Sequence, residues 1–462
     1  MRFFAIISVA ALTLLLTACS TNPSDTTVST QSTAAPTPPA TQPHVHSWTA
    51  EVTLPTCTQD GFTTERCDCG QTRQVDPVGA LGHTDGQWVQ TQAPGKTEPG
   101  SQQLSCAVCE VVLREEQIPA TGSLGLSYEL NEDGVSCTLV SAEQCQDTQV
   151  VIPEYYQGSK VTAIADEAFA GNNIMTEIHI PANIETIGSG IFSGCTALTT
   201  VYYDSAYSDM YNPFLAEPSI QRVVFNGNTV PDYICMYHSN IREILLGENV
   251  TAIGIAAFRG TAIEELAIPE TVTTIGVYAF TNCIELRQIV IPEGVATIGD
   301  YAFMGCMKAE SLRLPGSLTE ISAYAFENCI ALTEVVIPQG VTKIGFCAFY
   351  NCKGLERVVV ADTVTEVGDY AFTFNLALTD VQLPEGLIRI GDGAFSECAS
   401  LTEICIPSTV TQIGMRAFFN DPELSCIRFA GIVAQWETID KGDNWNKFTG
   451  ELMILCTDGQ IP

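Results

Sequence analysis

The sequence predicts a solenoid of the α/β type, made mostly of β-strand and irregular coil, with about 23 residues per coil and a parallel sheet on its concave face. Three observations predict this fold. A phenylalanine returns at a fixed interval, a short run of alternating apolar residues accompanies each return, and proline and glycine stand at the same places in every copy.

The interval between these marker phenylalanines sets the length of one coil. Seven of them lie 23 residues apart, at Phe280, Phe303, Phe326, Phe349, Phe372, Phe395 and Phe418. The series continues upstream at spacings of 22 or 23 residues through Phe258, Phe214, Phe192 and Phe169, with Tyr237 placed in its one gap. The sequence therefore predicts about 12 leucine-rich coils over residues 161–420.

One copy shows how a coil is built. In residues 401–418, Ile404 and Ile406 alternate inward as a short strand, and Pro407 ends that strand. Phe418 packs in the opposite wall. Stacked coils pair their strands in parallel, so each coil covers the apolar face of its neighbour.

The I-P, I-G and A-F signals, as in NCIELRQIVIPEGVATIGDYAF at 282–303, resemble the BspA-like class of leucine-rich repeat. The resemblance implies an N-terminal cap at 123–160 and a C-terminal cap at 421–462, which shield the last apolar layers. It also implies a surface protein that adheres to host matrix or to other cells. Between residues 199 and 247 the signals fade, which leaves the coil geometry there open.

The N-terminus is predicted to be a lipoprotein signal peptide, residues 1–18, followed by a tether. An apolar run ends in the sequence LTAC, which resembles the lipobox of bacterial lipoproteins and implies that Cys19 carries a lipid. An ordinary secretory signal is the alternative. Residues 19–43, rich in Ser, Thr and Pro, predict a flexible chain. The expected location is the extracellular face of the cell membrane, reached through the lipid anchor only.

Residues 44–122 are predicted to form two small modules rich in Cys, Trp and His. The two copies align when Gly61 is placed on Gly100, which also places Cys67 on Cys106. Each copy is about forty residues long and too small for a self-sufficient core. A cross-link or a metal ion is therefore expected to hold it together.

Two interpretations of the module cysteines stay open. A structural zinc ion is one, bound by cysteine with or without His46 or His83. Disulfides or free thiols are the other, because the first pair is C-x-C and the protein is predicted to be exported. No other cofactor is expected. The candidate zinc ligands are Cys67, Cys69, Cys106 and Cys109.

A different group of cysteines follows the marker phenylalanines by three residues. Its members are Cys195, Cys283, Cys306, Cys329, Cys352 and Cys398, with Asn375 and Asp421 in the same place in other coils. Leucine-rich repeats use small side chains here to bond the buried backbone of the bend. The pattern predicts a structural ladder of free buried thiols.

Composition and motifs argue against nucleic acid and against catalysis. Asp and Glu outnumber Lys and Arg by 53 to 20, a net charge of −33 that repels nucleic acid. No nucleophile elbow, metalloprotease motif or phosphate-binding loop occurs. The carboxylates are spread over solvent-facing positions of many coils, as solubility alone predicts. The sequence predicts no enzyme.

The strand register predicts two outward-facing columns of side chains that form a candidate ligand face. One column is mostly acidic and includes Glu243, Glu265 and Glu334. The other is mostly apolar and includes Tyr202, Val224, Leu245, Val290, Val336 and Val359. An exposed apolar stripe beside an acidic one is typical of a protein-binding face, although β-branched residues also simply suit a parallel strand.

These observations favour a surface-anchored adhesion protein whose partner is a protein ligand. A glycan-capture surface lipoprotein and a structural spacer without a specific ligand are the alternatives. Glycan binding requires aromatic rings for stacking, and Tyr202 is the only aromatic residue in the two regular columns. The sequence therefore favours a protein ligand over a sugar.

Overall fold

The computed structural model describes residues 45–208 and 217–462. The predicted signal peptide, the tether, Cys19 and Phe214 lie outside the described residues. The chain divides into two compact units, Met1–His83 and Thr84–Pro462.

The described part of the first unit, residues 45–83, is a three-stranded antiparallel sheet that we call the first module. Its strands are β1 (Trp48–Thr53), β2 (Gly61–Cys67) and β3 (Thr72–Val78). The second unit begins with a sheet of the same order and direction, the second module, residues 84–122. Its strands are β4 (Asp85–Gln92), β5 (Gly100–Cys106) and β6 (Val112–Ile118). Shared strand order and direction are what a duplication produces.

The remainder of the second unit is a β-solenoid with about 14 turns of about 23 residues each and little helix. It begins with a small sheet made by β7 (Ser127–Leu130), β8 (Ser136–Ser141), β10 (Tyr155–Tyr156), β11 (Ser159–Ile164) and β13 (Thr186–Ile187). It ends with α1 (Val433–Thr438) and β35 (Gly459–Ile461).

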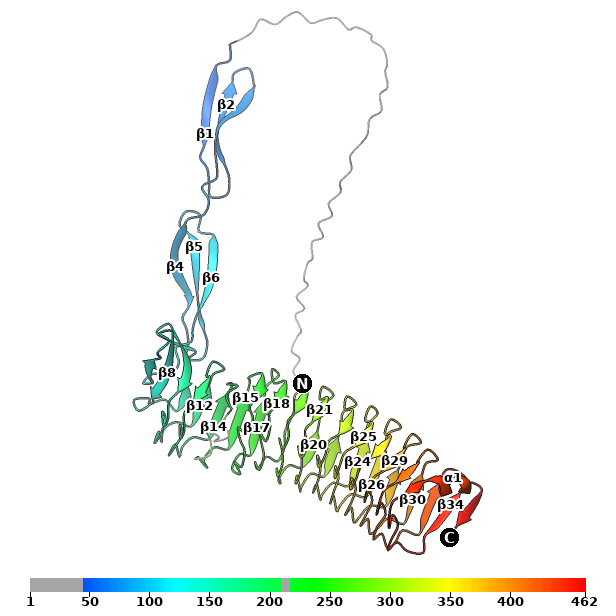
Figure 1. Cartoon of the computed structure of the whole chain (residues 1–462). Helices are drawn as coiled ribbons and strands as arrows, with labels where there is room; N and C mark the ends of the chain where they lie inside the picture. Colours follow the sequence, from blue (N-terminus) through cyan, green and yellow to red (C-terminus); the bar gives the residue numbers. More distant parts are fainter. Residues whose placement is uncertain (1–44, 209–216) are drawn as a thin grey trace, which may run out of the picture. The chain divides into compact units, whose positions relative to one another are not determined.

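One wall of the solenoid carries a ladder of parallel strands (Figure 1), whose outward side we call the strand face. The strands are β9 (Gln149–Val151), β12 (Glu177–Ile180), β14 (Thr200–Tyr203), β15 (Arg222–Phe225), β17 (Glu243–Leu246), β20 (Gln288–Val290), β22 (Ser311–Arg313), β24 (Glu334–Ile337), β26 (Arg357–Val360), β28 (Asp380–Gln382), β30 (Glu403–Ile406), β32 (Cys426–Phe429) and β34 (Met453–Cys456). β9 and β34 lie in the two segments expected to be caps, and both pair with strands of the ladder. Because these segments form turns of their own, the solenoid has more turns than the 12 coils counted from the sequence.

A second ladder of two-residue strands runs along another edge of the coils. It contains β16 (Thr229–Val230), β18 (Ala252–Ile253), β19 (Thr274–Ile275), β21 (Thr297–Ile298), β23 (Glu320–Ile321), β25 (Lys343–Ile344), β27 (Glu366–Val367), β29 (Arg389–Ile390), β31 (Gln412–Ile413) and β33 (Asp440–Lys441). The glycine of each I-G signal follows these strands where neighbouring coils approach closely. A Cβ on Gly276 would lie 2.6 Å from the backbone of Gly254, so a larger residue does not fit.

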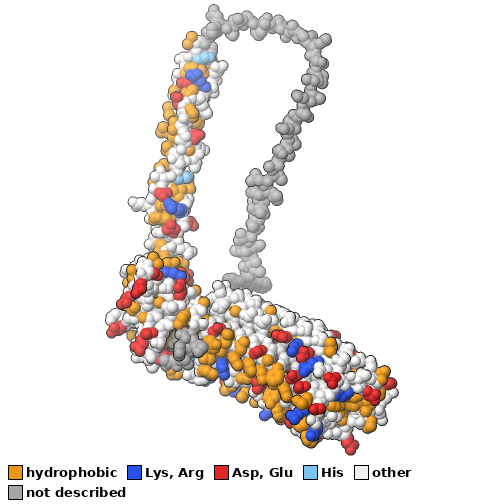
Figure 2. Space-filling view, viewed as in Figure 1, with side chains coloured by type: hydrophobic (Ala, Val, Ile, Leu, Met, Phe, Trp, Pro, Cys, Tyr) orange, Lys and Arg blue, Asp and Glu red, His pale blue; other side chains and the backbone are white. Residues whose placement is uncertain are grey.

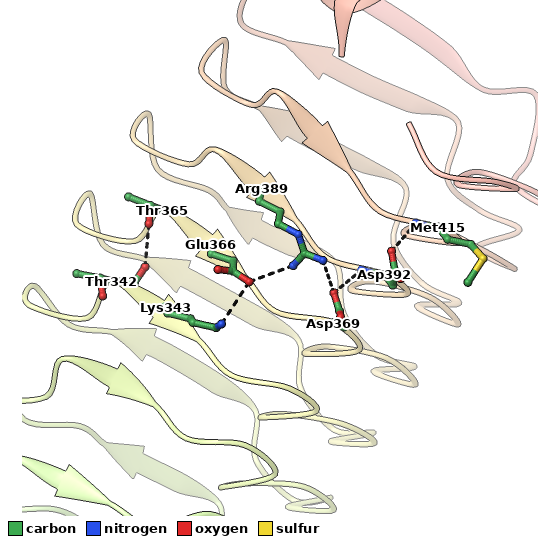
Figure 3. A network of polar contacts seen from close by, with 8 residues as sticks. All are labelled: Thr342, Lys343, Thr365, Glu366, Asp369, Arg389, Asp392 and Met415. Atoms are coloured by element: carbon green, nitrogen blue, oxygen red, sulfur yellow. Dashed lines mark hydrogen bonds and ion pairs between the residues drawn. The ribbon is translucent and has the colours of Figure 1, made fainter. Parts of the chain in front are cut away.

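Polar side chains along this second ladder bind one coil to the next (Figure 3). Arg389 contacts Glu366 at 3.0 Å and Asp369 at 2.6 Å, and Lys343 contacts Glu366 at 3.4 Å. The Asp369 carboxylate also accepts a hydrogen bond from the backbone N–H of Asp392. These charges are matched within the protein, so we assign this network to coil stacking.

The marker phenylalanines form the opposite side of the core. From Phe280 to Phe418, neighbouring rings stack with centroids 4.9 to 5.7 Å apart, and every ring is at most 1% exposed. The placement of Tyr237 in this series is wrong, because Tyr237 is 56% exposed. Cys235, 23 residues before Phe258 and fully buried, holds the inward position, and its N–H donates to Ala257 of the next coil.

The predicted ladder of buried thiols is present. Each thiol donates to the backbone carbonyl of the marker phenylalanine one coil upstream, for example Cys306 to Phe280 at 3.4 Å. In the same place Asn375 donates to Phe349 at 3.2 Å. Burial raises the pKa of Cys283 to about 11, and the thiol therefore stays protonated and able to donate.

Candidate functional site

The strand face has the alternating exposure that the register predicts. In β20, Val290 is 45% exposed, whereas Ile289 and Ile291 on either side are at most 3% exposed. In other coils Val336 is 52% exposed and Leu245 is 39% exposed. Three candidate ligand residues are therefore open to solvent.

The other three apolar candidates are less accessible. Tyr202 and Val359 are half-buried. The prediction that Val224 is exposed is wrong, because only 8% of this residue is accessible. Its partners in the ladder are Tyr202 and Leu245, and these two larger side chains flank the shorter valine.

The acidic column is exposed but partly neutralised. Glu334 lies 3.1 Å from Arg357, which also contacts Asp380 at 3.0 Å. Glu243 lies 3.4 Å from Arg222. Such exposed pairs contribute little to stability, about 0–1 kcal/mol each. They do lower the net negative charge beside the apolar column.

The ladder is interrupted at residues 265–268, where the structure has no strand. Leu266 and Ile268 are only partly buried there, unlike their counterparts Ile289 and Ile291 in the next coil. The turn before this segment is one residue shorter than the same turn in the next coil. Ile263 is the second residue after Thr261, whereas Leu286 is the third residue after Cys283. We attribute the interruption to this shorter turn.

The interruption leaves a shallow pocket of about 340 Å³ on the strand face. Leu266, Ile268 and Val290 give it an apolar lining, and Glu293 and Arg313 lie at its margin. Figure 2 shows hydrophobic side chains gathered over this middle part of the solenoid. This middle part of the strand face therefore has both exposed aliphatic side chains and a hollow.

A second hollow, of about 450 Å³, lies between the second module and the start of the solenoid. Its lining includes Pro119, Tyr155, His179 and Asp204. Burial lowers the pKa of His179 and raises the pKa of Asp204, which disfavours the charged form of both groups. Sequence reasoning missed this pocket, because its residues come from distant segments without a shared motif.

The candidate zinc ligands fall into separate groups. In the first module, Cys67 and Cys69 lie with His46, and the three ligand atoms are within 4.8 Å of one another. Cys106 and Cys109 belong to the second unit, where their sulfur atoms lie within the same distance of each other. The sequence analysis named His46 and His83 as possible ligands without assigning either to a pair, and the structure places His46 with Cys67 and Cys69.

The family model described as BspA type leucine-rich repeat region matches six copies, at residues 143–262, 251–375 and 319–439. No curated protein matches the chain. In the described residues, no helix has both the length and the apolar character that crossing a membrane requires.

Several solved structures are similar to this chain. A leucine-rich cell surface protein from Faecalibacterium prausnitzii is 25% identical, over 70% of this chain and 98% of its own, with a TM-score of 0.39. A leucine-rich repeat protein from Bacteroides ovatus is 24% identical, over 70% of this chain and 91% of its own, with a TM-score of 0.40. Since the family model matches well over half of the sequence, the chain belongs to the BspA-type leucine-rich repeat family.

Proposed function

We propose that this chain is a lipid-anchored surface protein that binds protein ligands of the host matrix or of other cells through its strand face. The exposed aliphatic side chains of Leu245, Val290 and Val336 beside the shallow pocket carry the proposal, and the exposed Arg313 lies between the two valines in the same column. Exposed aliphatic side chains lose water when a partner covers them, and the polar residues around them supply specificity. The proposed activity is binding, and no catalytic step is part of it.

A protein partner fits this face better than a glycan does. The single aromatic residue of the apolar column, Tyr202, stacks on His179 with ring centroids 3.9 Å apart and an interplanar angle of 6°. On its other side lies Val224, its partner in β15. One face of the ring is therefore covered by His179 and the ring is half-buried, which leaves a sugar less aromatic surface to stack on than an exposed ring offers.

The double variant Val290→Lys with Val336→Lys is expected to fold normally and lose binding. Both valines point outward, so lysine can extend into water, whereas under a bound partner two unpaired charges are buried. We expect affinity to fall by more than about tenfold. Binding of the double variant and of the unaltered chain is measured on immobilised fibronectin, laminin and collagen and on a glycan array. The two affinities are compared for each ligand that the unaltered chain binds.

Ile284→Lys with Ile330→Lys is the matched control. These isoleucines are 45% and 40% exposed, belong to the same two coils and lie before β20 and β24 instead of on them. The control adds the same charge and should keep full binding. Unaltered binding by the folded valine variant would contradict the proposal and move the site to the hollow lined by Tyr155 and His179. Binding to glycans alone would favour the glycan-capture alternative.

The anchoring part of the proposal depends on one thiol. Cys19→Ala is expected to move the protein from the membrane fraction into the medium, because the cysteine of the lipobox-like sequence is the acceptor of the lipid. Ser20→Ala, which keeps that cysteine, should stay in the membrane fraction. Cell fractionation and the mass of the N-terminal peptide test this. A Cys19→Ala protein that stays in membranes, with no lipid mass on the unaltered peptide, would rule out the anchor.

A further inference from the structure

The first module brings a histidine and two cysteines to one end of its sheet. Trp48 at the start of β1 pairs with Cys67 at the end of β2, so His46 lies beside the turn that follows β2. That turn is closed by the N–H of Gly70, which donates to the carbonyl of Cys67, and Gly70 adopts a φ of +86°. The tight turn places Cys69 on the same side as Cys67.

The distances among the three side chains are those of a shared ligand set. His46 Nδ1 lies 3.2 Å from Cys67 Sγ and 3.3 Å from Cys69 Sγ. Around a tetrahedral zinc ion with ordinary bond lengths, a nitrogen and a sulfur ligand are separated by about 3.5 Å. One ring nitrogen close to two sulfur atoms fits metal coordination. A Cys67–Cys69 disulfide would give the histidine no role.

The small apolar core of the first module is independent support for such an ion. Among residues 45–83, the buried hydrophobic residues are Cys57 and Cys67 alone. Apart from the half-buried Val75, the aliphatic residues of this stretch are exposed, among them Val52 at 65% and Leu81 at 62%. A sheet without a buried aliphatic core cannot gain enough free energy from apolar burial to stay folded, and small domains of this kind depend on metal ions or cross-links.

We propose that His46, Cys67 and Cys69 bind one zinc ion that stabilises the first module. Two thiolates and one imidazole are ligands that zinc prefers. The structure supplies three protein ligands, and because Cys69 is exposed, the fourth position around the ion is open to solvent. This metal site is separate from the strand face, so it can be tested without reference to the proposed binding function.

Zinc content measures the proposal directly. The chain from Ser20 onward, which keeps every described residue, is purified under reducing conditions and dialysed, and its zinc is counted per chain. His46→Ala and Cys69→Ser are each expected to lower the content by one equivalent. Cys405→Ser, which removes an exposed thiol from β30, should leave it unchanged. Any zinc held through Cys106 and Cys109 is the same in all four proteins and cancels in the difference.

Cobalt binding is a second readout on the Cys69→Ser variant, and proteolysis is a third readout that uses the unaltered chain. Cobalt bound to thiolate gives a sulfur-to-metal charge-transfer band, and Cys69→Ser should remove one site's share of that band. Removing zinc with a chelator should make residues 45–83 sensitive to protease while the solenoid stays resistant. Equal zinc content in Cys69→Ser and the unaltered chain would overturn the proposal. A Cys67–Cys69 disulfide in the exported protein, seen as a peptide lighter by two hydrogens, would overturn it as well.

Discussion

Ile291→Lys is expected to unfold the coils around β20, whereas Val290→Lys leaves the melting temperature nearly unchanged. Ile291 is 1% exposed and belongs to the continuous core, so a lysine there buries an unpaired charge among aliphatic side chains. Such changes cost more than about 4 kcal/mol, whereas surface substitutions usually alter stability by about 0.5 kcal/mol. Two adjacent positions should therefore respond in opposite ways.

Circular-dichroism melting of both variants measures this contrast. Each coil contacts mainly its neighbours, so hydrogen exchange should show the loss of protection centred on residues 265–337 and weaker toward the ends. A stable Ile291→Lys protein together with an unfolded Val290→Lys protein would mean that the strand register is shifted by one residue. Equal stability of both would mean that this coil is not packed as described.

The solenoid could be predicted from the sequence because its signals are local and repeated. A phenylalanine every 23 residues and the alternation around Ile289, Val290 and Ile291 fix which side chains face inward. The small residue three places after each phenylalanine repeats as well. The ladder in which Cys306 donates to Phe280 could therefore be anticipated.

The features that the sequence analysis missed depend on side chains of adjacent coils, which the sequence of a single coil does not show. Val224 is covered because Tyr202 and Leu245 flank it, which follows from three coils taken together. In the coil before Phe258, a cysteine replaces the aromatic marker, so a search for aromatic residues selected the exposed Tyr237 instead of Cys235. Spacing alone would have favoured Cys235, which lies 23 residues before Phe258.

Which histidine joins the C-x-C pair was left open by the sequence for a similar reason. A histidine and a cysteine pair 21 residues apart become neighbours only when β1 and β2 pair antiparallel, and the register of that hairpin is not evident from the sequence. His46 and the cysteines were named as candidates, but choosing His46 over His83 for this pair required the geometry of the sheet.

Asp421 is a buried carboxyl group in the ladder that is otherwise built mainly from thiols, with the amide of Asn375 and the hydroxyl of Thr261 in other coils. It is fully buried, and its Oδ1 accepts a hydrogen bond from the backbone N–H of Cys398 at 2.7 Å. Its Oδ2 is buried without a hydrogen-bond partner. In the same place Asn375 donates from Nδ2 to the carbonyls of Phe349 and Phe372. The site therefore suits an amide, or a protonated acid, better than a carboxylate.

This carboxyl group should make the solenoid less stable as the pH rises. Burial raises the pKa of Asp421 from 3.8 to about 8. Below about pH 4 the group is protonated in both the folded and the unfolded chain, so the full stability is present. Between about pH 4 and pH 8 only the unfolded chain releases the proton, and the free energy of unfolding should fall by about 1.4 kcal/mol per pH unit. Above about pH 8 the loss is complete.

Asp421→Asn is expected to remove this loss. The amide keeps an oxygen for the N–H of Cys398 and gains an N–H that can donate as Asn375 does, and it does not titrate. At pH 8 the variant should exceed the unaltered chain by about 4–6 kcal/mol, and near pH 4 the two should be similar. Asp362→Asn, at an exposed position, is the matched control and should leave the pH profile as it is. Urea unfolding across this pH range measures all three proteins. If Asp421→Asn kept the slope of the unaltered chain, the carboxyl group would have to be ionised in the folded state, with a cation or water at its Oδ2.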